Sequence, residues 1–231
     1  MYKVFLISDL HIKETGNEAL KAALAGLVQQ VGKDSVVIIT GDVTDNGASK
    51  EYTAAKKLLT PVRDACTLLA VPGNHDYGKL GNFYDSAAEK RWGKFCADLG
   101  MPRQNFIQGN TNIILLDSCL KSDAPLDFAQ GRVGEKQMNR LRDLRYAATK
   151  AGQDVIVALH HDPVSSRWVE RLQDGDELLR ETYGRVKALF FGHTHGPSHS
   201  WTCPRGIPTL LRMEGCFVSD CKGQPFVLET A

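Results

Sequence analysis

The chain has 231 residues and almost balanced charge, with 28 Lys and Arg side chains against 27 Asp and Glu side chains and a formal net charge of +1. This length suits one large domain with a well-buried core, and no linker, repeat or low-complexity segment divides it, so we predict a single domain over residues 1–231. The near-zero charge argues against nucleic acid and anionic membranes as partners, because both are recruited by bulk positive charge.

The N-terminal segment and the cysteines bear on the location of the protein. The first apolar run, residues 4–7, is too short for a signal peptide or a membrane span. The six cysteines contain no Cys-x-x-Cys pair, which is typical of reduced and mainly structural cysteines. We therefore predict a cytoplasmic protein.

Strand-like apolar runs alternate with helical patterns along the chain, which is typical of an α/β domain. After the run at residues 4–7, residues 15–18 have the spacing of a capping box, and Gly32 closes the predicted helix. A second helix is predicted from about Ser49 to the residues before Pro61. The apolar face of the first helix is formed by Leu20, Leu24, Leu27 and Val31.

The middle and the end of the chain continue this alternation. Residues 77–106 form an insertion that begins with turn-forming residues and continues as a helical pattern, and we expect it to cap or wall the functional site. Three short pieces near the C-terminus predict an antiparallel meander that completes a second sheet. The predicted elements are strands at 112–116, 155–159 and 188–191, a helix marked by Met138, Leu141 and Leu144, and the meander pieces 209–213, 216–219 and 226–228.

Five apolar runs end in residues that can bind a metal ion. Because the carboxyl ends of parallel strands meet at one edge of a sheet, we expect these residues to gather in one place. Six of the seven histidines belong to these motifs, and the seventh, His199, follows shortly after the last. The runs and their following residues are 4–7 with Asp9 and His11, 36–39 with Asp42, 68–71 with Asn74, His75 and Asp76, 155–159 with His160 and His161, and 188–191 with His193 and His195.

The chemistry of these residues favours two transition-metal ions. Asp, Asn and His form a hard-to-borderline ligand set that suits Mn, Fe, Zn, Ni or Co. A single ion would leave several of these polar groups without partners, whereas two ions about 3.5 to 4 Å apart can share a bridging carboxylate. Asp42 is the best candidate for the bridge. Such a pair lowers the pKa of a bound water to roughly 7, and phosphate ester hydrolysis benefits most from hydroxide at neutral pH.

The five motifs, Asp-x-His, Gly-Asp, Gly-Asn-His-Asp, His-His and Gly-His-x-His, resemble those of the calcineurin-like metallophosphoesterases in type and order. The stretch Leu116-Asp117-Ser118 and residues 131–144 resemble the class III cyclic-nucleotide phosphodiesterase branch. The resemblance implies a four-layer αββα sandwich of two mixed β-sheets flanked by helices, with a dinuclear metal site at the sheet edge.

The resemblance also implies roles for individual residues. Asp42 would bridge two ions, with Mn or an Fe/Mn pair favoured. His75 would stabilise the transition state or protonate the leaving oxygen, and Asp76 would orient His75. The remaining ligands would be Asp9, His11 and His195 for the first ion, and Asn74, His160 and His193 for the second. The implied activity is hydrolysis of small phosphodiesters, such as cyclic nucleotides, through attack by a metal-bound hydroxide.

Several alternatives stay open at this point. His160 is preferred to His161 as the ligand only by the family pattern, and Asp117 ends an apolar strand but matches no ligand position. His199 and Trp201 are candidates for the substrate pocket, although a surface loop position is the simpler interpretation. Among residues 165–167, Arg167 is the more plausible phosphate contact. A phosphomonoesterase, a nucleotide pyrophosphohydrolase, a nuclease and a catalytically silent protein-binding scaffold are the other functions considered, and the oligomeric state stays undefined.

Overall fold

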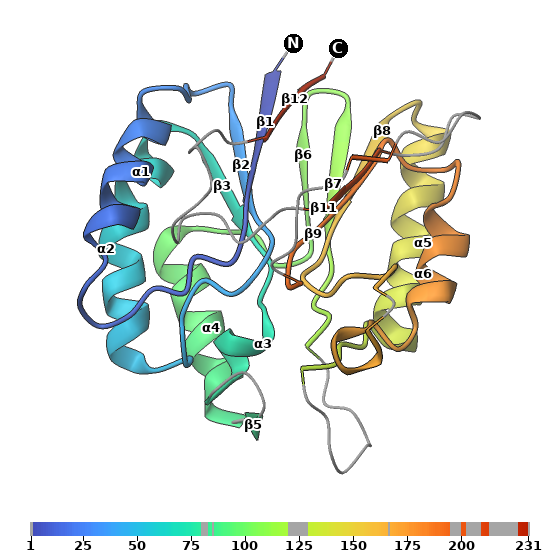
Figure 1. The fold of residues 1–231 in the computed structure, drawn as a ribbon. Coiled ribbons are helices and arrows are strands. Elements are labelled where there is room, and N and C mark those ends of the chain that lie inside the picture. The colour runs from blue at the N-terminus through green and yellow to red at the C-terminus, as the bar shows by residue number, and fades with distance from the viewer. Residues whose placement is uncertain are drawn as a thin grey trace.

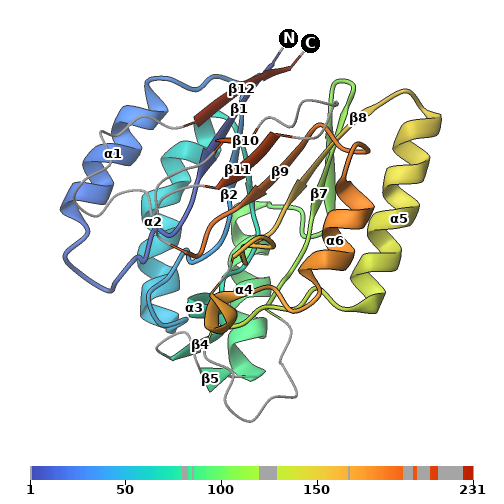
Figure 2. The same ribbon diagram turned by 45° about the vertical axis from the view of Figure 1, so that its right-hand side comes forward.

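The computed structural model describes residues 2–79, 83–84, 86–119, 129–165, 167–194, 200–201, 209–212 and 226–230. Two β-sheets face each other, and helices cover the outer face of each sheet (Figure 1). Turning the molecule shows the same four layers, with the helices of the two halves on opposite sides (Figure 2). The predicted four-layer αββα sandwich is thus confirmed.

The first sheet has the strand order β12-β1-β2-β3. Its strands β1, β2 and β3 run parallel, and β12 is antiparallel to β1. β2 is covered on both faces, so every one of its residues is buried and its sequence is a continuous apolar run. The strands are β1 Tyr2–Ile7, β2 Val36–Ile39, β3 Thr67–Ala70 and β12 Phe226–Thr230.

The second sheet has the strand order β10-β11-β9-β8-β7-β6. Its central strands β7, β8, β9 and β11 run parallel, and the two edge strands are antiparallel to their neighbours. The strands are β6 Asn105–Gln108, β7 Thr111–Leu115, β8 Asp154–Ala158, β9 Ala188–Phe191, β10 Ser200–Trp201 and β11 Thr209–Arg212. A separate two-stranded sheet pairs β4 Gly78–Lys79 with β5 Phe83–Tyr84.

The helices divide between the two outer layers. α1, α2 and α4 cover the first sheet, and α5 and α6 cover the second (Figure 1). The α-helices are α1 Glu18–Val28, α2 Ser49–Ala65, α3 Asn74–Tyr77, α4 Ser86–Leu99, α5 Glu135–Lys150 and α6 Gly175–Thr182, and a 3-10 helix covers Trp168–Glu170. No helix among the described residues combines the length and the hydropathy that crossing a bilayer requires.

Three buried apolar clusters hold the four layers together. The middle cluster lies between the two sheets and includes Leu6, Ile38, Ile113 and Phe190. The other two lie between each sheet and its helices. Burying both faces of both sheets in this way fixes the ends of the strands, and those ends carry the predicted ligands.

Three predicted helix boundaries in the first half of the chain need correction. α1 ends at Val28, so Val31 and Gly32 of the predicted helix follow it. α1 begins at Glu18 and not at a cap on Thr15, because the Asn17 side chain instead closes a turn by bonding both backbone groups of Lys13. α2 continues past Pro61 to Ala65. Pro61 is exposed, so water can hydrate the carbonyl that its missing N–H leaves free.

The predicted C-terminal meander is wrong. β11 lies parallel to β9 in the second sheet, whereas β12 pairs antiparallel with β1 in the first sheet. The piece at residues 216–219 lies outside the described residues. β1 and β9 each offer an edge to which a further strand can pair. The residue pattern of a short apolar strand does not specify which of these two edges it joins.

The helix of the 77–106 segment belongs to the core of the first half. Trp92 and Phe95 of α4 are buried, and their rings lie 6.5 and 5.4 Å from the ring of Tyr52 in α2. Cys96 and Leu99 are buried in the same cluster. The capping role expected for residues 77–106 stays a prediction. The helix α6 and the edge strand β6 were not predicted from the sequence.

Candidate metal centre

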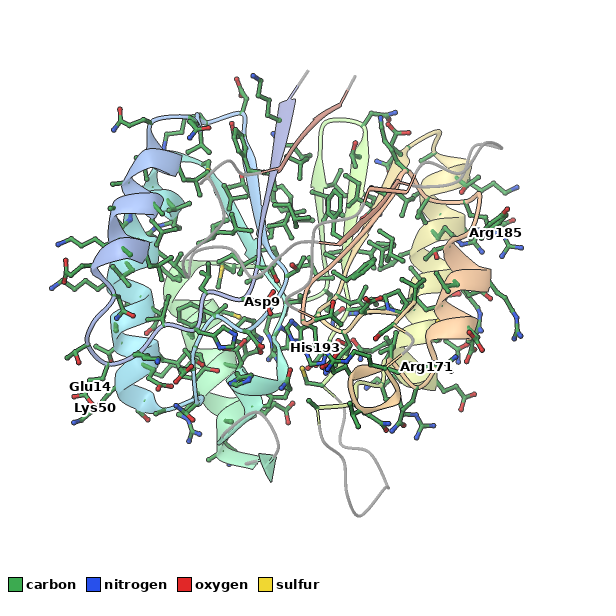
Figure 3. The ribbon with its side chains drawn as sticks, in the orientation of Figure 1. Asp9, Glu14, Lys50, Arg171, Arg185 and His193 are labelled. Carbon is green, nitrogen blue, oxygen red and sulfur yellow. The ribbon has the colours of Figure 1, made fainter. Side chains whose placement is uncertain are left out.

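The predicted ligand motifs lie where the carboxyl ends of two sheets meet. β1, β2 and β3 carry the first three motifs and belong to the first sheet, whereas β8 and β9 carry the last two and belong to the second. The expected single sheet edge is therefore corrected to a junction of two edges. Figure 3 shows Asp9 and His193 at this junction. The His193 backbone N–H donates to Asp9 Oδ1 at 3.2 Å, which links the two sheets directly.

The His160 side chain is the centre of the cluster. Its Nδ1 lies 2.8 Å from the Thr40 carbonyl, which can only accept, so Nδ1 donates and the other ring nitrogen, Nε2, is available as a ligand. Nε2 lies 3.0 Å from Asn74 Oδ1, 3.0 Å from His193 Nδ1 and 3.3 Å from Asp42 Oδ2. Ligand atoms bound at about 2.1 Å to one ion are separated by such distances. The arrangement fits a metal ion held by these four residues.

Asp42 lies between this group and His11. Its Oδ2 atom is 3.3 Å from His160 Nε2 and 3.8 Å from His11 Nε2, while its Oδ1 atom accepts the His75 backbone N–H at 3.0 Å. One carboxylate oxygen thus faces imidazoles from both predicted ion sites. This geometry fits the bridging position predicted for Asp42.

The buried charges favour a cation at this point. Burial raises the pKa of the Asp42 carboxyl, but the charge and hydrogen bond of His160 outweigh this and hold that pKa well below its usual range. Burial lowers the pKa of His160, yet the charge of Asp42 raises it to about 9. The site therefore stabilises positive charge beside Asp42. A metal cation would supply that charge in place of the proton on His160 Nε2.

The backbone at the cluster is strained. Only five non-glycine residues in the described part of the chain have a positive φ, and four of them are predicted ligands. Side chains other than glycine rarely adopt this conformation, and such strain concentrates at functional sites where surrounding structure enforces it. The four are Asp9 (φ 54°), His11 (φ 43°), Asp42 (φ 50°) and His193 (φ 77°). The sequence gives no direct sign of this feature.

Gly73 allows the loops after β2 and β3 to approach closely. A Cβ atom at this position would lie 2.8 Å from Asp42 Cγ and would also overlap the Asp42 backbone nitrogen. Because the φ of Gly73 is −108°, substitution there tests contact and not backbone strain.

We expect Gly73→Ala to displace Asp42 and to lower turnover by roughly 10²-fold, the loss that a displacement of about 1 Å can cause. Metal content and phosphodiester hydrolysis measure this effect. Gly26→Ala is the matched control, because nothing lies within 4 Å of the added Cβ in α1. Equal activity of the two variants would show that close packing at Gly73 does not matter for the site.

His75 is held by the backbone of the loop after β2. Its Nδ1 lies 2.7 Å from the Asp45 carbonyl, so Nδ1 donates and Nε2 is available to a substrate. Its ring meets the ring of His11 edge to face, with centroids 4.6 Å apart. His75 thus lies beside the predicted ligand His11.

The prediction that Asp76 orients the His75 ring needs correction. Asp76 is fully buried and accepts hydrogen bonds from the backbone N–H groups of Val43, Thr44 and Gly73 at 3.1, 2.9 and 2.9 Å. The His75 ring is oriented by the Asp45 carbonyl instead. Burial, and next the charge of Asp42, raise the pKa of Asp76 to about 6. Through its hydrogen bonds to the Val43, Thr44 and Gly73 backbone, Asp76 links the loop after β2 to the loop after β3.

Asp45 is the residue that sequence reasoning missed, whereas His161 was expected to pack beside the ligands. The Asp45 carboxylate lies 3.5 Å from His11 Nδ1, so the loop that supplies Asp42 also supplies a partner for His11. His161 is buried with its ring centroid 4.5 Å from that of His193, and burial holds its pKa well below its usual range. Only the spacing of three residues between Asp42 and Asp45 could have pointed to Asp45.

The remaining candidate residues have a structural role, lie on the surface or fall outside the described residues. Asp117 accepts the Tyr77 hydroxyl at 2.7 Å and the Cys119 backbone N–H at 2.9 Å, which fits its predicted structural role. Arg167 is exposed and pairs with Glu170 at 3.0 Å. His195, His199 and the Trp201 side chain lie outside the described residues. The structure brings together Asp9, His11, Asp42, Asn74, His75, His160 and His193.

A sequence model of the family described as Calcineurin-like phosphoesterase matches residues 2–197, which is most of the chain. The chain belongs to this family. A probable glycerophosphodiester phosphodiesterase from Arcobacter nitrofigilis is 30% identical to this calcineurin-like phosphoesterase over 210 residues, covering 83% of this chain and 71% of that protein. A cAMP/cGMP dual specificity phosphodiesterase from Mycobacterium tuberculosis is 27% identical over 241 residues, covering 95% and 69%.

The solved structures agree with this assignment at the level of the fold. A dimetal phosphatase from Danio rerio superposes on this calcineurin-like phosphoesterase with a TM-score of 0.69 at 15% identity, covering 93% of this chain and 87% of that one. The resemblance inferred from the five motifs is confirmed.

Proposed function

We propose that this calcineurin-like phosphoesterase hydrolyses small phosphodiesters at a dinuclear metal centre. The proposal rests on one observation. Asp42, Asn74 and His193 converge within 3.3 Å of His160 Nε2, while His160 Nδ1 is hydrogen-bonded to the Thr40 carbonyl. A related protein named as a glycerophosphodiester phosphodiesterase and one named as a cyclic nucleotide phosphodiesterase both point to small diesters as the substrate class.

The ligand roles are assigned from the motif order together with the contacts. Asp42 would bridge the two ions, because its Oδ2 atom faces both His11 and His160. The other ligands would be Asp9, His11 and His195 for one ion, and Asn74, His160 and His193 for the other. Two bound ions would supply hydroxide at neutral pH and neutralise the phosphoryl oxygens. The donor set suits Mn or an Fe/Mn pair, and a cytoplasmic location stays a prediction.

Side chains of the protein would position the substrate and supply a proton to the leaving oxygen. His75 would meet the substrate with Nε2, because Nδ1 is fixed by the Asp45 carbonyl at 2.7 Å. A histidine in this position can donate a proton to the leaving oxygen or stabilise charge on the phosphoryl group. The buried junction of the two sheets holds the ligands in place, so that little reorganisation is needed during the reaction.

The first test compares hydrolysis of bis-p-nitrophenyl phosphate with that of p-nitrophenyl phosphate after addition of Mn²⁺. We expect a strong preference for the diester, followed by turnover of cyclic nucleotides or glycerophosphodiesters. A preference for the monoester would move the assignment to a phosphomonoesterase. Two bound metal ions without turnover of any phosphate ester would favour the protein-binding scaffold.

A further inference from the structure

Ser118 lies in the loop after β7 and contacts both members of the His160–His161 pair. Its Oγ is 3.3 Å from the His160 backbone nitrogen, 3.2 Å from the His161 backbone nitrogen and 2.8 Å from His161 Nδ1. All three residues are fully buried, so each of these polar groups depends on the protein for its hydrogen bond.

The three contacts of this hydroxyl determine where the proton of His161 lies. Backbone N–H groups can only donate, so the two lone pairs of Ser118 Oγ accept from His160 and His161. The single hydroxyl proton then points to the nearest neighbour, His161 Nδ1. Because Nδ1 accepts this bond, neutral His161 carries its own proton on Nε2.

His160 has the opposite arrangement. Its Nδ1 donates to the Thr40 carbonyl at 2.8 Å, which leaves Nε2 to bind a metal. In His161 it is Nε2 that carries the proton, and this atom is buried and has no hydrogen-bond partner among the described residues. The Nε2 atoms of the two adjacent histidines thus differ: that of His160 can bind a metal, and that of His161 carries a proton.

The His161 ring cannot readily turn to exchange these nitrogens. A Cβ atom at Gly131 would overlap the ring and lie 2.7 Å from the His161 Cβ, so the ring packs directly against the Gly131 backbone. The ring of His193 lies against it as well, with centroids 4.5 Å apart. Ser118 is fixed in turn, because its carbonyl accepts the Arg132 backbone N–H at 2.8 Å.

We propose that Ser118 is a positioning residue whose hydroxyl keeps the proton of His161 on Nε2 and thereby reserves metal binding for His160. The role in metal binding rests on the proposed function, whereas the tautomer of His161 does not. An imidazole that carries its proton on the only nitrogen left free cannot bind a metal without losing that proton.

The test is NMR of the imidazole nitrogens in full-length protein labelled with ¹⁵N-histidine, recorded without metal and after loading with Zn²⁺. We expect His161 to keep a protonated Nε2 and an unprotonated Nδ1 in both states, and Zn²⁺ to shift Nε2 of His160. In Ser118→Ala the His161 ring should populate both tautomers. The affinity for Zn²⁺ should fall roughly 10–100-fold, the usual loss when a hydrogen-bond partner of a metal ligand is removed. Ser118→Thr, which keeps the hydroxyl, should preserve both properties.

Either of two results would overturn the proposal: a proton on Nδ1 of His161, or a Zn²⁺-dependent shift at Nε2 of His161 in place of His160. Unchanged tautomer and affinity in Ser118→Ala would do the same. If Ser118→Ala fails to fold, the spectra of the wild-type protein and of Ser118→Thr still decide. A protein that binds no Zn²⁺ would contradict the proposed function. The metal-free spectrum would still test the tautomer of His161 independently.

Discussion

Asp42→Asn is expected to remove both metal ions and to lower phosphodiester hydrolysis by more than the roughly 10–100-fold that loss of an outer partner of a metal ligand causes. The substitution keeps the shape of the side chain but removes its charge. Asp42 Oδ2 faces His160 Nε2 at 3.3 Å and His11 Nε2 at 3.8 Å, so one change weakens both predicted ion sites. The neutral amide would leave the fully buried His160 without the carboxylate that stabilises its positive charge.

Metal analysis of the purified variant and steady-state kinetics measure this effect, and circular dichroism shows whether the fold survives. Asp34→Asn is the matched control, because Asp34 is exposed in the turn before β2. The control should keep the metal content and turnover of the wild type. Two metal ions and normal turnover in Asp42→Asn would remove Asp42 from the proposed bridge.

His75→Ala is expected to keep the metal ions and to lower turnover by roughly 10²- to 10⁴-fold, the range that a positioned acid–base group contributes. His75 donates its backbone N–H to Asp42 Oδ1, and this contact does not require the ring. The ring itself is anchored by the Asp45 carbonyl with Nε2 left for the substrate. Removing it should therefore affect the reaction more than the metal site.

The leaving group distinguishes the two roles considered for His75. A proton donor matters most for poor leaving groups, so the loss should be larger for an alkyl phosphodiester than for bis-p-nitrophenyl phosphate. Equal losses on both substrates would indicate stabilisation of phosphoryl charge instead. Tyr183→Ala serves as the control for loss of an exposed ring, since 57% of Tyr183 is exposed. Full turnover of His75→Ala on both substrates would exclude His75 from the mechanism.

The local order of strand and ligand could be predicted from the sequence. Each apolar run specifies a buried strand, and the polar residues directly after it emerge at its carboxyl end whatever the rest of the fold does. Asp42 after β2 and His160 after β8 could therefore be placed at strand ends before the fold was known. The four-layer architecture followed from the family that these motifs resemble.

Contacts between distant segments could not be predicted in this way. The Asp45 carbonyl bonds the His75 ring, and the Ser118 hydroxyl bonds His161, across separations of 30 and 43 residues. The assignment of Asp76 failed for the same reason, because its carboxylate reaches back 32 residues to the Thr44 backbone. Adjacency of Asp76 to His75 in sequence gave no information about these partners.

The sequence by itself determined the α/β class, the family and the residues that can bind metal, because periodicity and residue type are local properties. The tertiary structure decided that β1–β3 and β8–β9 belong to different sheets whose ends meet, and that β11 and β12 pair with different sheets. It also imposed a positive φ on Asp9, His11, Asp42 and His193. These features depend on packing two twisted sheets against each other, and only the assembled core compensates for the strain that brings the ligands together.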